Sequence, residues 1–314
     1  MSIELAFQYL VGGAAGALWL GLLLPRLAQG RPLLPSEPRF VIPWRGEHVA
    51  LVVVMLFLLP QVAVFNLLGP PAGEPAAVTN SAQQQESRPQ APASKQKTQQ
   101  PTRHYSADQM LQAVAIQAVS SLLLLPVAGW LLWKLAGANW RDLGFVRGKL
   151  LSDVALGLLA FAALAAPVYL VQAISQYIWE GQVEEHSITA LLKEQSSPVP
   201  FLICGLAAAV AAPAVEEVTF RLVLQGWLEK VEDRYGDRGL LRLLPTGRWS
   251  ILISSVLFAT VHTTWITPIP LFVFALGLGY LYQQTHRILP CIVTHASLNS
   301  VTLILMWLTR GSPT

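Results

Sequence analysis

The sequence is poor in charge and almost free of cysteine. Charged residues make up only 12% of its 314 residues, whereas soluble domains usually reach about a quarter. The two cysteines, Cys204 and Cys291, both lie in apolar runs, which argues against a disulfide framework. No basic patch is interleaved with aromatic residues, so nothing indicates nucleic-acid binding. Hydrophobic residues supply 53% of the chain, and this composition predicts a polytopic membrane protein.

Eight apolar segments can be read as helices that cross or enter a bilayer, since a crossing takes about twenty apolar residues. The eight predicted helices are 5–25, 49–68, 110–135, 154–177, 201–228, 249–266, 270–284 and 288–308. The seventh is short, which fits a helix surrounded by protein rather than by lipid. The predicted fold class is therefore all-α, a polytopic membrane helix bundle of about eight transmembrane helices.

The composition divides the chain into three regions. Residues 1–69 are expected to form an N-terminal two-helix membrane segment, and residues 109–314 a membrane core. Between them, residues 70–108 are rich in Gln, Pro, Ala and Ser, which predicts a disordered linker. The first apolar segment has Glu4 and no Lys or Arg ahead of it, so an anchor is expected rather than a signal peptide.

The charges of the short loops predict the orientation. The loops after the first, third and fifth segments are rich in Lys and Arg, and the loop after the seventh carries Arg287, which places all four in the cytoplasm by the positive-inside rule. The loop after the fourth segment instead carries Glu180, Glu184, Glu185 and Glu194, which fits the outer face. We expect an integral protein of the cell inner (plasma) membrane.

A few polar side chains interrupt the apolar runs of the C-terminal half. An ionised group near the bilayer centre costs about 2.5 to 3.5 kcal/mol, so each needs a reason. The groups are Glu216, Glu217, Arg221, His262, His295 and Asn299. Residues four apart share a helix face, and three such pairs occur: Glu217 with Arg221, Phe258 with His262, and His295 with Asn299. We expect these faces to converge in a cavity that opens toward the cytoplasm.

The chemistry of this cavity is limited by its residue types. No motif pairs a Ser or Cys with a His, and Ser254, Ser255 and Ser297 are interpreted as small packing residues. A carboxylate desolvated in an apolar pocket holds a proton more readily, which suits a general base near neutrality. Hydrolysis by activated water is the natural interpretation.

The order of these motifs resembles a known family. Glu216-Glu217-x-x-x-Arg221, Phe258-x-x-x-His262 and His295-x-x-x-Asn299 follow one another on separate predicted helices. This arrangement resembles the CPBP intramembrane proteases, which include the type II CAAX prenyl endopeptidases and the lysostaphin-resistance-like bacterial proteins. Leu143-Gly144-Phe145 also looks like the start of that family's core, so the resemblance covers about 143–308 and makes 109–314 a CPBP-like protease core.

The resemblance implies a role for each residue of the motifs. Glu216 would be the general base that deprotonates the attacking water, and His262 would help to hold that water. His295 and Asn299 would stabilise the oxyanion, a contribution of about 2.7 to 4 kcal/mol for each donor. The remaining three residues would be supporting: Glu217 is neutralised by Arg221, and Phe258 packs beneath the histidine.

A zinc-dependent version of the same protease stays open at this stage. Its ligands would be Glu216, His262 and His295, because two Glu and two His resemble zinc ligands. The His-Glu-x-x-His motif is absent, however, and the ligands would come from three helices. We therefore expect a glutamate-type site without a cofactor.

The expected function is an intramembrane endopeptidase. Its partners would be the lipid bilayer and a membrane-associated protein or peptide substrate. One alternative is an inactive membrane scaffold, similar to bacteriocin immunity proteins, that binds a partner protein. Another is a secondary transporter whose buried Glu and His relay protons, but the sequence shows none of the inverted repeats expected for one.

Overall fold

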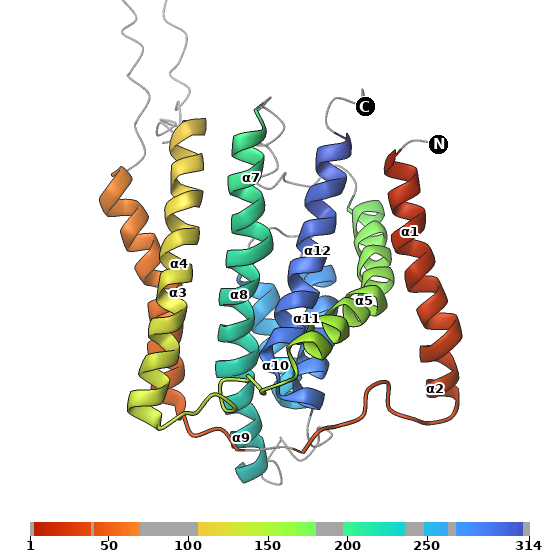
Figure 1. Cartoon of the computed structure of the whole chain (residues 1–314), viewed down its shortest axis with the longest axis horizontal. Coiled ribbons are helices and arrows are strands. Elements are labelled where there is room, and N and C mark those ends of the chain that lie inside the picture. The colour runs from red at the N-terminus through yellow and green to blue at the C-terminus, as the bar shows by residue number, and fades with distance from the viewer. Residues whose placement is uncertain are drawn as a thin grey trace, which may run out of the picture.

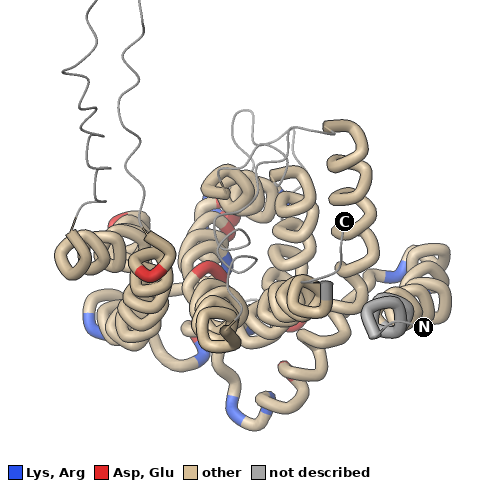
Figure 2. Tube along the Cα trace, turned by 90° about the horizontal axis from the view of Figure 1, so that it is seen from above, with Lys and Arg blue, Asp and Glu red and all other residues tan. Residues whose placement is uncertain are grey.

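The computed structural model describes residues 3–38, 41–69, 106–179, 197–235, 248–262 and 268–309. In these ranges every regular element is a helix, and most of the long helices run side by side along one direction (Figure 1). Viewed along that direction, nearly all of each helix is free of charge (Figure 2). The predicted all-α membrane bundle is confirmed.

The elements include three π-helical segments, which are labelled η. In chain order the structure contains α1 (Ile3–Leu18), η1 (Trp19–Leu23), α2 (Leu24–Ala28), α3 (Gly46–Leu68), α4 (Ala107–Ala136), α5 (Leu150–Ile178), α7 (Pro198–Leu206), η2 (Ala207–Ala211), α8 (Ala212–Glu217), η3 (Val218–Gln225), α9 (Gly226–Tyr235), α10 (Trp249–Thr260), α11 (Pro268–Thr285) and α12 (Ile288–Thr309). Elements α7 to α9 follow one another without a break and form one long helix.

Six helical stretches in the described part of the chain are long and apolar enough to cross a membrane, rather than the eight expected. The two predicted helices that are not among these six are 249–266 and 270–284. Helix α10 has only 12 residues, which at 1.5 Å per residue spans about 18 Å and is too short for a crossing. Helix α10 packs against α11 within the bundle. The sequence already suggested that 270–284, which corresponds to α11, is surrounded by protein because it is short.

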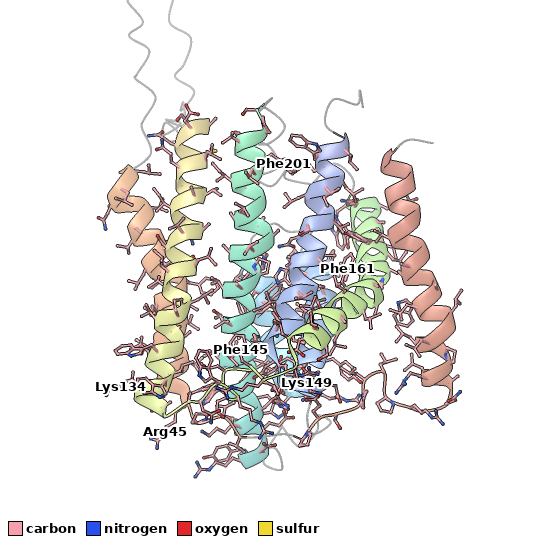
Figure 3. The ribbon with its side chains drawn as sticks, in the orientation of Figure 1. Arg45, Lys134, Phe145, Lys149, Phe161 and Phe201 are labelled. Carbon is pink, nitrogen blue, oxygen red and sulfur yellow. The ribbon has the colours of Figure 1, made fainter. Side chains whose placement is uncertain are left out.

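The positively charged loops gather at one end of the bundle. Arg45, Lys134 and Lys149 all lie at this end, which is the lower one in Figure 3. Arg45 and Lys149 belong to the loops after the first and third predicted helices, and Lys134 lies in the last turn of α4, so the structure brings these two loops to a common face. The Glu-rich loop and residues 70–105 of the predicted linker lie outside the described residues, whereas Asp108 is already in α4.

Helix α4 has strong signals at both ends. Ser106 caps its start, because the Ser106 hydroxyl accepts a hydrogen bond from the Gln109 amide and the Gln109 side chain accepts one from the Ser106 amide. Gly137, at φ +71°, ends the helix in the left-handed conformation. These signals fix the two ends of α4, which packs extensively along α3.

A lysine clamp fixes the segment that leads into α3. The Lys230 ammonium on α9 donates hydrogen bonds to the carbonyls of Ile42, Pro43 and Trp44 at 3.0, 3.3 and 3.0 Å. The Trp44 indole, fully buried, donates to the carbonyl of Val223 in η3 at 3.1 Å. The start of α3 is thereby held to the long helix that carries the two glutamates.

The turn at Gly144 supports the start of α12. Gly144 has φ +78°, and its carbonyl accepts a hydrogen bond from the Ile288 amide at 3.2 Å. A Cβ atom at Gly144 would lie 2.8 Å from the Ile288 nitrogen, whereas a Cβ atom at Gly148, with φ +75°, would meet nothing within 4 Å. Close approach as well as backbone conformation therefore requires glycine at position 144.

This difference predicts unequal effects of two matched substitutions. Gly148→Ala should cost about 1 to 2 kcal/mol of folding free energy, from the left-handed conformation alone. Gly144→Ala should cost clearly more, because the start of α12 must also move. Thermal unfolding of both variants in the same detergent measures the difference, and equal melting temperatures would contradict the assigned contact.

Candidate active site

The two adjacent glutamates at the end of α8 have different surroundings. Successive helical residues point about 100° apart, so one carboxylate can face a cavity while the other faces the core. Glu217 is fully buried. Glu216 is partly exposed and lines a cavity of about 1000 Å³. The pair is therefore unequal in structure, as the sequence suggested.

Glu217 belongs to a buried polar cluster. Arg221 Nε lies 3.2 Å from Glu217 Oε2, and both side chains are fully buried. Arg221 Nη1 donates to Ser254 Oγ at 2.8 Å, and that hydroxyl donates to the Phe220 carbonyl at 3.1 Å. Ser254 was expected to be a simple packing residue. Ser254 instead accepts a hydrogen bond from the Arg221 guanidinium. This guanidinium also lies 5.2 Å from the centre of the Phe258 ring.

Glu217 also orients His295, which the sequence did not predict. His295 Nδ1 lies 2.8 Å from Glu217 Oε1, across 78 residues of sequence. The carboxylate is paired with Arg221 and can only accept, so Nδ1 carries the hydrogen. The other ring nitrogen, Nε2, is then directed at Glu216, 3.8 Å from its Oε2.

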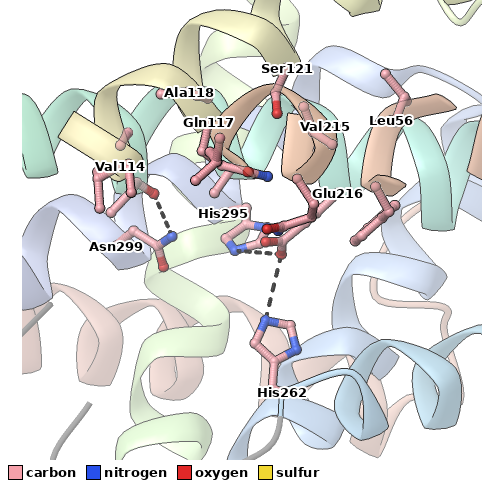
Figure 4. Close-up of a pocket in the computed structure, with 18 of the residues that line it drawn as sticks. Leu56, Val114, Gln117, Ala118, Ser121, Val215, Glu216, His262, His295 and Asn299 are labelled. Atoms are coloured by element: carbon pink, nitrogen blue, oxygen red, sulfur yellow. Dashed lines mark hydrogen bonds and ion pairs between the residues drawn. The ribbon is translucent and has the colours of Figure 1, made fainter. Parts of the chain in front are cut away.

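His262 is held in a similar way by its own helix. Its Nδ1 lies 2.7 Å from the Phe258 carbonyl oxygen. A carbonyl can only accept, so Nδ1 is the donor and Nε2 of the neutral ring is an acceptor. This Nε2 is also 3.8 Å from Glu216 Oε2. Figure 4 shows the carboxylate between the two imidazoles.

Glu216 Oε2 has no hydrogen-bond partner within the described residues. Separations of 3.8 Å to both Nε2 atoms are too long for direct hydrogen bonds. Contacts beyond about 3.5 Å are typical of groups bridged by water. The arrangement can thus hold a small hydrogen-bonding molecule beside the carboxylate.

Phe258 supports both histidines. Its fully buried ring lies 4.9 Å from the ring centre of His262 and 5.8 Å from that of His295. The sequence placed Phe258 beneath His262 only. The second contact joins α10 to α12.

Asn299 lines the same cavity and depends on a π-helical segment. Its Nδ2 donates to the carbonyl of Ala208 in η2 at 2.7 Å. A π-helix interrupts the regular ladder of backbone hydrogen bonds. In η2 the Ala208 carbonyl accepts a hydrogen bond from the Asn299 side chain of α12. A primary amide has two N–H groups, so a second donor of Asn299 remains for a ligand.

Helices α3 and α4 form the cavity wall opposite Glu216, which the sequence did not predict. The wall is mostly apolar, with Leu56, Phe57 and Val62 on α3 and Val114 on α4. The available signal was the spacing on α4, where four cavity residues recur at i, i+3, i+4 and i+7. They are Val114, Gln117, Ala118 and Ser121. The predicted boundary at residue 69 thus separates two helices that share this wall.

A family comparison covers the part of the chain that contains these residues. Residues 198–301 match the model of a family described as type II CAAX prenyl endopeptidase Rce1-like. In this segment the chain is similar to the CAAX protease family. The segment contains Glu216, His262, His295 and Asn299, whereas α3 and α4 lie outside the match. Comparisons with curated proteins and with solved structures give no match to the chain.

The same segment contains the three side chains that a zinc-dependent site would use. Among the described residues, no group of three or more His, Cys, Asp or Glu side chains is placed to hold a metal ion. The zinc set of Glu216, His262 and His295 is therefore not arranged as metal ligands in this structure.

Proposed function

We propose that this protein is an intramembrane endopeptidase in which Glu216 activates water to hydrolyse a peptide bond of a membrane-associated substrate. Similarity to the CAAX protease family supports peptide hydrolysis. One observation carries the mechanism: Glu216 Oε2 has no hydrogen-bond partner in the described chain and stands 3.8 Å from Nε2 of both His262 and His295.

The attacking water lies between Glu216 Oε2 and His262 Nε2. Both atoms are acceptors, so the water donates one hydrogen to each and its lone pairs point away from them. As the water oxygen attacks the substrate carbonyl carbon, Glu216 takes the proton as general base. It then passes this proton to the leaving amine, which breaks the carbon–nitrogen bond.

His295 and Asn299 stabilise the oxyanion that forms on the carbonyl oxygen. His295 donates from Nε2, and because its Nδ1 already donates to Glu217, the ring carries both protons in this step. The Glu217 carboxylate stabilises this cation. In this step the oxyanion and Glu217 are negative, and His295 and Arg221 are positive. The charges therefore balance, which limits the cost of placing them in a poorly solvated site.

The site faces the cytoplasm in this proposal. His295 is seven residues beyond Ile288, the start of α12, so it lies about 10 Å from that end of the helix. Arg287 immediately precedes this end, and the positively charged end of the bundle is assigned to the cytoplasm by the positive-inside rule. We place the protein in the cell inner (plasma) membrane.

The proposal is tested with an internally quenched peptide whose C-terminus carries a farnesylated CAAX sequence, matching the substrate type in the family description. Purified protein in proteoliposomes should cleave it, with one product pair by mass spectrometry. The same peptide without the lipid shows whether prenylation matters. Absence of cleavage of both peptides, and of any membrane peptide in cells that overproduce the protein, would count against a protease.

We further propose that no metal takes part. Cleavage should survive exhaustive treatment with a membrane-compatible chelator at more than about half the untreated rate. Elemental analysis of the purified protein should find far less than one zinc per chain. Loss of activity that added zinc restores, with copper and nickel as controls, would instead establish the zinc-dependent version.

A further inference from the structure

We propose that Gln117 on α4 is a positioning residue that binds the substrate's peptide backbone across the cavity from Glu216. This inference rests on the proposed peptidase function and identifies which part of the substrate the opposite wall recognises. No catalytic step is assigned to Gln117.

The placement of Gln117 is the first argument. The α4 face at Val114, Gln117, Ala118 and Ser121 lines the catalytic cavity, and α4 packs against η2 and α8. In Figure 4 the Gln117 amide reaches from this wall toward Glu216 and His295. Its polar end is therefore directed at the space in front of the proposed base.

The chemistry of the wall is the second argument. Around Gln117 most of the wall is formed by small or apolar side chains such as Val114 and Ala118, and α3 adds Leu56, Val62 and one further amide, Gln61. Within the described residues the Gln117 amide makes no hydrogen bond. Placing an amide on an apolar membrane helix has a cost that a bound partner offsets.

The needs of the substrate are the third argument. An extended peptide that enters an apolar cavity loses the water bound to its N–H and C=O groups, and each unpaired group costs free energy. A glutamine amide offers one acceptor and two donors, so it can pair with both groups of one peptide unit. A lipid chain would gain nothing from Gln117, which is why we assign the amide to the peptide.

The test measures binding separately from cleavage. The Glu216→Gln variant in nanodiscs is titrated into a fluorescein-labelled, farnesylated CAAX peptide and followed by anisotropy. Gln117→Leu in this background should raise the dissociation constant about tenfold, the effect of losing one or two hydrogen bonds. The matched control is Gln112→Leu on the same helix, since Gln112 is exposed and does not line the cavity; it should change affinity less than twofold.

A backbone scan separates positioning from a structural role. In each of the last four peptide bonds an ester replaces the amide, which removes one N–H. At one of these positions the ester should weaken binding about tenfold when Gln117 is present and have no further effect in Gln117→Leu. The inference would be overturned by any of three results. These are equal affinity of the Gln117→Leu and Gln112→Leu proteins, strictly additive ester effects, and no saturable peptide binding.

The same data distinguish this inference from the proposed function. Gln117-dependent binding of the peptide, together with no cleavage of it or of any membrane peptide in cells, would support Gln117 and count against the peptidase. Cleavage by the wild type together with Gln117-independent binding would support the peptidase and reject Gln117.

Discussion

Glu216→Gln is expected to reduce peptide hydrolysis by about 10² to 10⁴-fold, because this is the contribution of a positioned general base to the rate. Glutamine has nearly the same shape but cannot take a proton from water. Glu216 Oε2 has no hydrogen-bond partner in the described chain, so folding should hardly change. The measurements are kcat in proteoliposomes and the melting temperature of the same preparation.

Glu47→Gln is the matched control for this substitution. Glu47 lies in the first turn of α3 and its side chain is 65% exposed, so the control removes one carboxylate far from the cavity and should keep wild-type kcat. Full activity of Glu216→Gln would refute the base assignment. If that variant also restored every phenotype of a deletion strain, the protein would be better described as a scaffold that binds a partner.

Arg221→Met is expected to be the most destabilising single substitution at the site. Removing one partner of a buried ion pair leaves an uncompensated charge, which costs about 3 to 5 kcal/mol. Arg221 and Glu217 are both fully buried, and water cannot replace the lost guanidinium. The melting temperature in detergent should fall sharply, and cleavage should fall with it because Glu217 no longer holds His295 in place.

Combining Arg221→Met with Glu217→Gln separates stability from catalysis. The neutral pair leaves no isolated charge, so much of the lost melting temperature should return. Activity should stay low, since a glutamine can accept a hydrogen bond from His295 Nδ1 but does not stabilise the cationic ring. A double variant no more stable than Arg221→Met would contradict the buried ion pair as the source of the loss.

The location of the site could be predicted because charge is so costly inside a membrane. Glu216, His262, His295 and Asn299 stood out in apolar runs, and the structure places all four on one cavity. The helices were predictable from apolar length for the same reason. Their boundaries shifted most at two C-terminal ends: the helix predicted to end at residue 228 continues to Tyr235, and α10 ends at Thr260 although the apolar run continues beyond it.

The contacts between helices could not be predicted in the same way. A spacing of four showed that Glu217 can meet Arg221, but nothing local indicates that Glu217 also bonds His295, 78 positions away. The wall made by α3 and α4 was missed because the low-complexity stretch between them suggested a boundary. The π-helical segments have no composition signal, since η2 contains only alanine and valine.

Segment η2 makes the number of residues in this helix as important as their identity. Deleting one alanine from Ala207–Ala211 would let the segment return to a regular α-helix, because a π-helical turn is closed by an i→i+5 hydrogen bond and an α-helical turn by an i→i+4 bond. The Ala208 carbonyl would then leave Asn299, although every proposed catalytic side chain would still be present. Insertions and deletions here should therefore be far less tolerated than substitutions among small residues.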